Sequence, residues 1–307
     1  MLKKIQFLLP LALPFIVYLL FEGGLALYPV NIFSQISDQS YFLPLTFVLL
    51  IGLFFLIHLL MPIVTQKFWK CQSLKGPIRQ RLDALCAKAN FHCRDIKTWG
   101  VMDHALTAAI IGIHPRFRYV LFTKRLIREM KPECIEAILC HEIGHSYHRH
   151  LLLFPFILGG MGICGVAASY LITYSFDFFI GSNIFSDMQE YLYDATMFVA
   201  YGITALVYFR YVFGYFSRLF ERQADLHIFN VKLNPSHLIE ALNYFAQSSG
   251  QDPRKPDWHH YSIQERIDYI TVASKHQNLI AIHHSYVQTM LYIYFGCFFS
   301  LLLLFFS

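Results

Sequence analysis

Five long apolar stretches set the main constraint on how this 307-residue chain can fold. A segment needs about 20 mostly apolar residues to cross a bilayer as a helix. Only 15% of the residues are charged, against about 25% in soluble domains, so the chain is expected to be a multi-pass integral membrane protein. The expected spans are Ile5–Phe21, Tyr41–Val64, Leu151–Phe176, the short Ala195–Phe209 and Val287–Phe306, the first favoured as an anchor over a cleaved signal peptide.

The distribution of Lys and Arg predicts which side of the membrane each loop occupies, because basic residues collect in cytoplasmic loops. Residues 28–40 and 175–190 contain no Lys or Arg, whereas basic residues gather before the first span and after the second and fourth. We therefore expect the N-terminus, residues 65–150 and residues 210–285 to face the cytoplasm. No basic cluster has the interleaved aromatics of a nucleic-acid site, so no nucleic-acid partner is expected.

The sequence His141-Glu142-Ile143-Gly144-His145 is an HExxH pattern on a helix expected to begin near Pro132. Histidines four residues apart lie on one helix face and can bind one metal ion together, while Glu142 can take a proton from a bound water. This pattern is typical of zinc enzymes that hydrolyse peptide bonds. The bland alternative is a helix with two surface histidines. Cys140 is a weaker candidate nucleophile, because HExxH already supplies a complete mechanism.

A zinc hydrolase needs a third protein ligand and one open position. Glu221 is the best candidate, and it begins an ExxxD pattern that ends at Asp225. Asp225 lies one helical turn later on the same face, where it can accept the ring N–H of a ligand histidine. The alternative is a solvated helix face on which both carboxylates pair with Arg218 or Arg222. Four other histidines are expected at the membrane surface. They are His148 and His150, just after the motif, and His283 and His284, beside the last span.

Between the spans the pattern is that of a small soluble domain. The expected strands are residues 96–102, 106–113 and 118–123, and the expected helices are residues 78–90, 123–130, 132 onward to the third span, and 217–230. Asn234-Pro235 and the capping box Ser262–Glu265 are expected to start two more helices.

Taken together, these motifs resemble the membrane-embedded gluzincin family, which contains the HtpX-like heat-shock proteases and the type I CAAX prenyl proteases. The matching elements are HExxH, two following spans, Ser217-Arg218 ahead of the ExxxD pattern, and His260 followed by Arg266-Ile267. They cover about residues 75–275. The chain departs from the family at Asp103-His104-Ala105, where relatives often have an Asn-Ala pair that binds the substrate backbone. His104 either replaces the Asn or is only a surface residue.

The resemblance implies a mainly α fold with multi-span membrane helices and a zincin-like α+β metalloprotease domain that has a small β-sheet. It implies that His141, His145 and Glu221 bind one Zn²⁺ per chain, that Glu142 is the general base, and that Asp225 supports the ligands. His260, preferred over His259 on spacing, and Arg266 would stabilise the oxyanion. The implied regions are two spans in 1–64, the HExxH half in 65–150, two spans in 151–209, the ExxxD half in 210–285 and a last span in 286–307.

The expected activity is quality-control cleavage of membrane proteins or lipid-anchored peptides, by an active site that faces the cytoplasm close to the bilayer of an inner membrane or endomembrane. One alternative is a processing protease for prenylated substrates. A second is an inactive, metal-binding membrane scaffold, which the intact Glu142 disfavours.

Overall fold

The computed structural model describes residues 52, 59–180, 187–250, 252–258 and 260–306. The expected span at 5–21 and most of the span at 41–64 lie outside these residues. The described chain divides into two compact units, one up to Glu142 and the other from Ile143 onward. Helix α6, Pro132–Tyr147, begins in the first unit and ends in the second.

The first unit contains the small β-sheet that the sequence predicts. Its four strands lie in the order β1-β2-β4-β3, and only β2 and β4 run parallel. Every residue of β4 is buried, which fits its place between two neighbouring strands. The three predicted strands are shorter than expected: β2 is Asp95–Trp99, β3 is Ala108–Ile111 and β4 is Tyr119–Thr123. The fourth strand, β1, Gln72–Ser73, was not predicted.

The described part of the first unit also contains helical residues 59–68, two short helices and the start of α6. Helix α4, Pro77–Lys88, buries Leu82 and Leu85, and helix α5, Lys124–Glu129, follows β4 directly. A 3₁₀ turn, Pro115–Phe117, joins β3 to β4. Arg81 on α4 bonds Glu133 and Glu136 on α6 at 2.8 and 2.6 Å, so it links the two helices at the surface of the unit.

A break separates the HExxH helix from the next long helix. Helix α6 ends at Tyr147, and helix α7, His150–Ile180, begins three residues later. Between them Arg149 has a left-handed φ of 60°, which no α-helix accommodates. The expectation that this helix continues directly into the third span is therefore wrong, because the helix is interrupted at His148 and Arg149.

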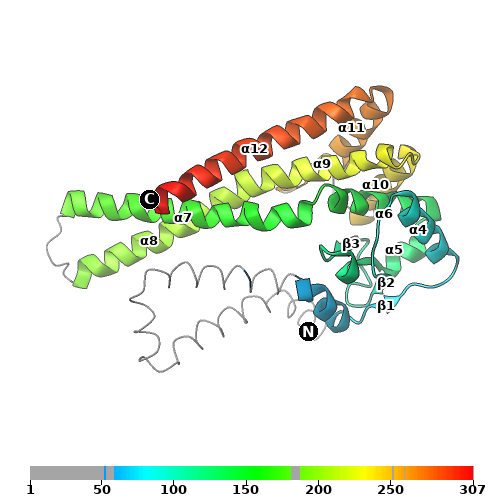
Figure 1. The fold of residues 1–307 in the computed structure, drawn as a ribbon, viewed down its shortest axis with the longest axis horizontal. Coiled ribbons are helices and arrows are strands. Elements are labelled where there is room, and N and C mark those ends of the chain that lie inside the picture. Colours follow the sequence, from blue (N-terminus) through cyan, green and yellow to red (C-terminus); the bar gives the residue numbers. More distant parts are fainter. Residues whose placement is uncertain (1–51, 53–58, 181–186, 251, 259, 307) are drawn as a thin grey trace. The chain divides into compact units, whose positions relative to one another are not determined.

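Three helical runs of the second unit are long and apolar enough to cross a membrane: His150–Phe176, Tyr191–Asn230 and Asn278–Leu304. The middle run joins helix α8, Asp187–Val207, a π-helical segment, Tyr208–Phe213, and helix α9, Gly214–Asn230. It is much longer than the predicted span at 195–209, because the helix continues past Arg210. Helix α12, Asn278–Phe306, lies along α9 and α7 in Figure 1.

These long helices pack through one apolar cluster that lies near their site-facing end. Ile157 of α7, Phe220 of α9 and Val287 of α12 are almost fully buried in it. In the most apolar part of each candidate span, less than a fifth of the residues are buried within the protein. Most of that surface is therefore available to lipid.

The remaining two helices start as the sequence predicts. Helix α10, Pro235–Ser249, has Asn234 as its N-cap, whose side chain accepts from the Ser236 N–H at 3.0 Å. Helix α11, Ile263–Lys275, begins with the complete capping box between Ser262 and Glu265.

Candidate metal centre

The site is built where α6 crosses α9 at Gly144. A Cβ atom on Gly144 would lie 2.8 Å from His227 Cβ and 2.9 Å from both the Cα and the carbonyl oxygen of Ala224. Since no side chain fits at those distances, glycine is what allows the two helix backbones to touch. The close approach brings the last turn of α6 against the acidic residues of α9.

Three side chains converge at this crossing. His141 and His145 on α6 and Glu221 on α9 have ligand atoms that all lie within 4.8 Å of one another. The Nε2 atom of His145 is 3.4 Å from Oε1 of Glu221. Two ligands at zinc's bond length of about 2.0–2.1 Å in a tetrahedron are separated by roughly 3.3 Å. The three predicted ligands therefore lie together, and their spacing is compatible with a bound metal ion.

On its other side, Glu221 faces two further residues that the sequence singles out. Its Oε2 atom lies 3.4 Å from Nδ1 of His260 and 3.6 Å from Nη1 of Arg266. The His260 side chain is 39% exposed, whereas those of Glu221 and Arg266 are 12% and 14% exposed. His260 is thus the group of this set that remains most open to an incoming molecule.

Asp225 pairs with Arg266 through two parallel hydrogen bonds. Arg266 donates from Nε to Oδ2 at 2.8 Å and from Nη2 to Oδ1 at 2.7 Å. The capping box places Arg266 in the first turn of α11, where its backbone N–H bonds the Ser262 carbonyl. The solvated-face alternative fails for both carboxylates, because Glu221 and Asp225 are 9% and 2% exposed.

The second ring nitrogen of His145 contacts a residue that sequence reasoning assigned to the surface. Nδ1 of His145 lies 3.0 Å from Nδ1 of His150, and His150 is fully buried. His283 is also buried, and its Nε2 lies 3.1 Å from the Leu219 carbonyl. The expectation of a surface position is therefore wrong for both. The burial of both histidines depends on partners that are distant in the sequence and lie on other helices.

Two neighbouring groups are kept uncharged by burial. Burial and the surrounding histidines lower the pKa of His148 to about 3, so it stays neutral at physiological pH. Burial raises the pKa of the Cys140 thiol to about 12. A thiol that stays protonated is a poor nucleophile, which weighs against the cysteine alternative. His104 is exposed before β3, with its carbonyl accepting from Arg125 at 3.0 Å.

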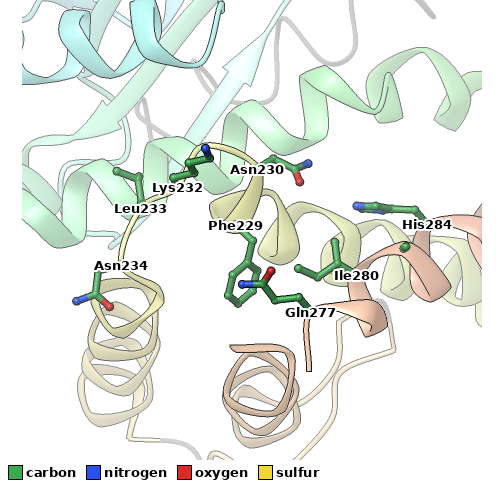
Figure 2. A pocket seen from close by; sticks show the side chains of 9 residues that line it. Phe229, Asn230, Lys232, Leu233, Asn234, Gln277, Ile280 and His284 are labelled. Atoms are coloured by element: carbon green, nitrogen blue, oxygen red, sulfur yellow. The ribbon is translucent and has the colours of Figure 1, made fainter. Parts of the chain in front are cut away.

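A cleft of about 720 Å³ opens in the second unit beside the site helices. Figure 2 shows Phe229 and Asn230 at the end of α9, Asn234 at the start of α10, and Ile280 and His284 on α12 around it. Lys232 and Gln277 add polar groups to its wall. His284 thus has one side toward this cleft.

Two comparisons with known proteins found matches. The sequence model of Peptidase family M48 matches residues 72–285. The crystal structure of S. mikatae Ste24p is similar, with a TM-score of 0.55, 20% identity and 84% of this chain covered, which shows a shared fold. The chain spans 64% of the length of that protein's chain. No curated protein matches the chain.

Proposed function

The chain belongs to peptidase family M48, and from that premise we propose that it is an integral-membrane zinc metalloendopeptidase that cleaves membrane or membrane-associated proteins in quality control. The observation that carries the proposal is the convergence of His141, His145 and Glu221, with Glu142 next to the first ligand. Family membership confirms the gluzincin resemblance seen in the sequence.

One zinc ion per chain fits the donor set. Two neutral imidazoles and one carboxylate are a common ligand set of catalytic zinc sites, which leave a fourth position open. Asp225 and Glu221 carry two negative charges against the single positive charge of Arg266, so a divalent cation compensates the excess. Held by His141, His145 and Glu221, a zinc ion would act as a Lewis acid for the scissile carbonyl and would lower the pKa of a bound water to about 7.

Glu142 performs the proton transfers. As the residue after ligand His141, it lies on α6 at the site, and its side chain is only half-buried. Its carboxylate takes the proton from the attacking water and delivers it to the amine of the leaving peptide. A positioned general base of this kind typically contributes a factor of about 10²–10⁴ in rate.

His260 and Arg266 stabilise the negative charge that develops on the carbonyl oxygen. His260 is the more exposed donor, and Arg266 is held in place by its two bonds to Asp225. Donors aimed at a developing oxyanion are typically worth roughly 3–4 kcal/mol.

The substrates are membrane proteins or lipid-anchored peptides. Glu221 belongs to the same 40-residue helical run, Tyr191–Asn230, that is long enough to cross a bilayer. A site on such a helix is expected close to the membrane. Substrates that are themselves held in the membrane would meet it more readily than soluble ones. The basic residues that flank the spans favour a site on the cytoplasmic side.

The experiment that tests this function offers one peptide with and without a prenyl group to the detergent-purified protein with zinc, and measures cleavage by mass spectrometry. Glu142→Gln is the blank. Equal cleavage of both forms supports quality control. Cleavage of the lipidated form alone supports the processing alternative, and cleavage no greater than the blank supports the inactive scaffold.

A further inference from the structure

A chain of side chains leads outward from the metal ligand His145. Its Nδ1 lies 3.0 Å from Nδ1 of His150, and Nε2 of His150 lies 3.0 Å from Oε1 of Gln223. The amide nitrogen of Gln223 then lies 3.0 Å from Nδ1 of His284. These contacts join α6, α7, α9 and α12, which are far apart in sequence.

The amide of Gln223 gives this chain a direction. Its oxygen accepts only, so His150 must carry its proton on Nε2 and present a bare Nδ1. That bare nitrogen accepts the N–H of His145 Nδ1, so the lone pair of His145 lies on Nε2, the nitrogen 3.4 Å from Oε1 of Glu221. At the far end, the amide N–H donates to His284.

The opposite direction does not serve a metal site. If the Gln223 amide were flipped, His150 would donate from Nδ1 to His145, whose proton would then lie on Nε2. That nitrogen faces Oε1 of Glu221 at 3.4 Å, and a protonated nitrogen cannot bind a metal ion. Only the outward direction is compatible with a ligand histidine.

Burial makes the arrangement rigid. His150 is fully buried and Gln223 is 5% exposed. The ring of His150 stacks on Phe220 with centroids 4.2 Å apart and planes 7° apart. Burying a polar ring costs free energy unless its nitrogen atoms are hydrogen-bonded. Both ring nitrogens of His150 have partners.

We propose that His150 is a positioning residue which, held by Gln223, fixes the tautomer and ring orientation of the ligand His145. The inference rests on the proposed zinc site and assigns to a histidine the supporting role that a carboxylate or backbone carbonyl usually has beside a ligand. His284, at the outer end beside the cleft in Figure 2, closes the chain.

Two substitutions at position 150 separate shape from hydrogen bonding. His150→Phe keeps a ring that stacks on Phe220 but removes the acceptor. His150→Asn loses the ring but keeps an acceptor where Nδ1 was. We expect His150→Phe to weaken zinc binding about 10–100-fold, as loss of such partners typically does, and His150→Asn to restore most of that loss.

Zinc affinity is measured by competition with a chromophoric chelator, alongside thermal unfolding of the zinc-free protein and kcat. A purely structural role predicts the reverse order, with His150→Asn the worse variant in all three. If His150→Phe binds zinc as tightly as the wild type, or His150→Asn binds it as weakly as His150→Phe, the inference is wrong. A wild-type protein that binds no zinc would instead overturn the proposed function.

Variants at Gln223 and His284, the next residues in this series of contacts, test the inference independently if His150→Phe does not fold. Gln223→Met has a similar shape but neither accepts nor donates, so it should weaken zinc binding less than His150→Phe and more than His284→Leu. His283→Phe is the matched control, since His283 is buried next to His284 but bonds the Leu219 carbonyl. It should lower the unfolding temperature and leave zinc affinity unchanged. Equal zinc affinity in Gln223→Met and the wild type would contradict the inference.

Discussion

Two helix contacts in the second unit each depend on a glycine, and they differ in what the glycine admits. At Gly144 the nearest atoms are the backbone of Ala224 and Cβ of His227 on α9. At Gly160 on α7 the nearest atoms are the hydroxyl groups of Tyr208 and Tyr294. The first glycine lets two backbones meet, whereas the second makes room for the ends of side chains.

The polar groups at the two contacts also differ in kind. Around Gly144 they are ionisable: two ligand histidines, Glu221, and the buried pair of Asp225 with Arg266. Around Gly160 they are neutral hydroxyls, and Tyr208 donates to the Ile157 carbonyl at 2.6 Å. Burying charged groups costs free energy, and such groups are concentrated at reactive sites. A neutral hydroxyl can hydrogen-bond a backbone carbonyl inside a span at a smaller cost. The comparison separates a contact made for chemistry from one made for assembly.

The largest effect should follow Glu142→Gln, which removes the base at the first contact and leaves the packing unchanged. We expect peptide cleavage to fall about 10²–10⁴-fold, with zinc content and unfolding temperature unchanged. Glu240→Gln, at an exposed position of α10, is the control and should cleave normally. Cleavage by Glu142→Gln at the wild-type rate would mean that the α6–α9 contact carries no acid–base chemistry.

Next in size is Asp225→Ala, which leaves the mostly buried Arg266 side chain, 14% exposed, without its bidentate partner. Removing one member of a buried ion pair typically costs about 3–5 kcal/mol, measured here by chemical unfolding in detergent. Arg81→Met is the matched control, because Arg81 is 40% exposed where it bonds Glu133 and Glu136. It should cost only about 0–1 kcal/mol. Equal losses in the two variants would show that the charges near Gly144 are effectively solvated.

A direct comparison of the two glycines comes third. Gly144→Ala forces backbone atoms apart and should cost roughly 1–3 kcal/mol, as overpacking does, and should also weaken zinc binding. Gly160→Ala should cost less, since tyrosine hydroxyls can move aside, and should leave zinc binding intact. Gly162→Ala, whose added Cβ would have no atom within 4 Å, is the neutral control. Weaker zinc binding in Gly160→Ala would remove the distinction between the two contacts.

The smallest effect belongs to Tyr294→Phe. It removes the hydroxyl that bonds Tyr208 at 2.9 Å but keeps the ring against Phe216. A single such hydrogen bond is worth about 0.5–1.5 kcal/mol, so thermal unfolding should shift slightly while peptidase activity stays unchanged. A loss of activity without a loss of stability would assign the tyrosine pair a role in the reaction.

The sequence predicted the local features of this fold because neighbouring residues determine them. The N-cap at Asn234 and the capping box at Ser262 need only a side chain within three residues of the backbone group it bonds. Likewise, HExxH places its two histidines on one helix face without help from the rest of the chain.

Features that depend on distant partners were missed or misjudged. The burial of His150 follows from Phe220 and Gln223, which lie about 70 residues later in the chain. The break at Arg149 arises in a stretch with no Gly or Pro to signal it. A helix was expected to continue beyond the span that ends at Arg210, but the π-helical segment Tyr208–Phe213 was not foreseen. A pattern of neighbouring residues in the sequence does not predict these features.

The most direct test of the central claim is the zinc content of the purified protein and of two variants, measured by mass spectrometry of the metal together with peptide cleavage. The account predicts about one zinc per chain and cleavage in the wild type, zinc without cleavage in Glu142→Gln, and neither in Glu221→Gln. Zinc retained at the wild-type level in Glu221→Gln would contradict the assignment of the α6–α9 crossing as the metal centre.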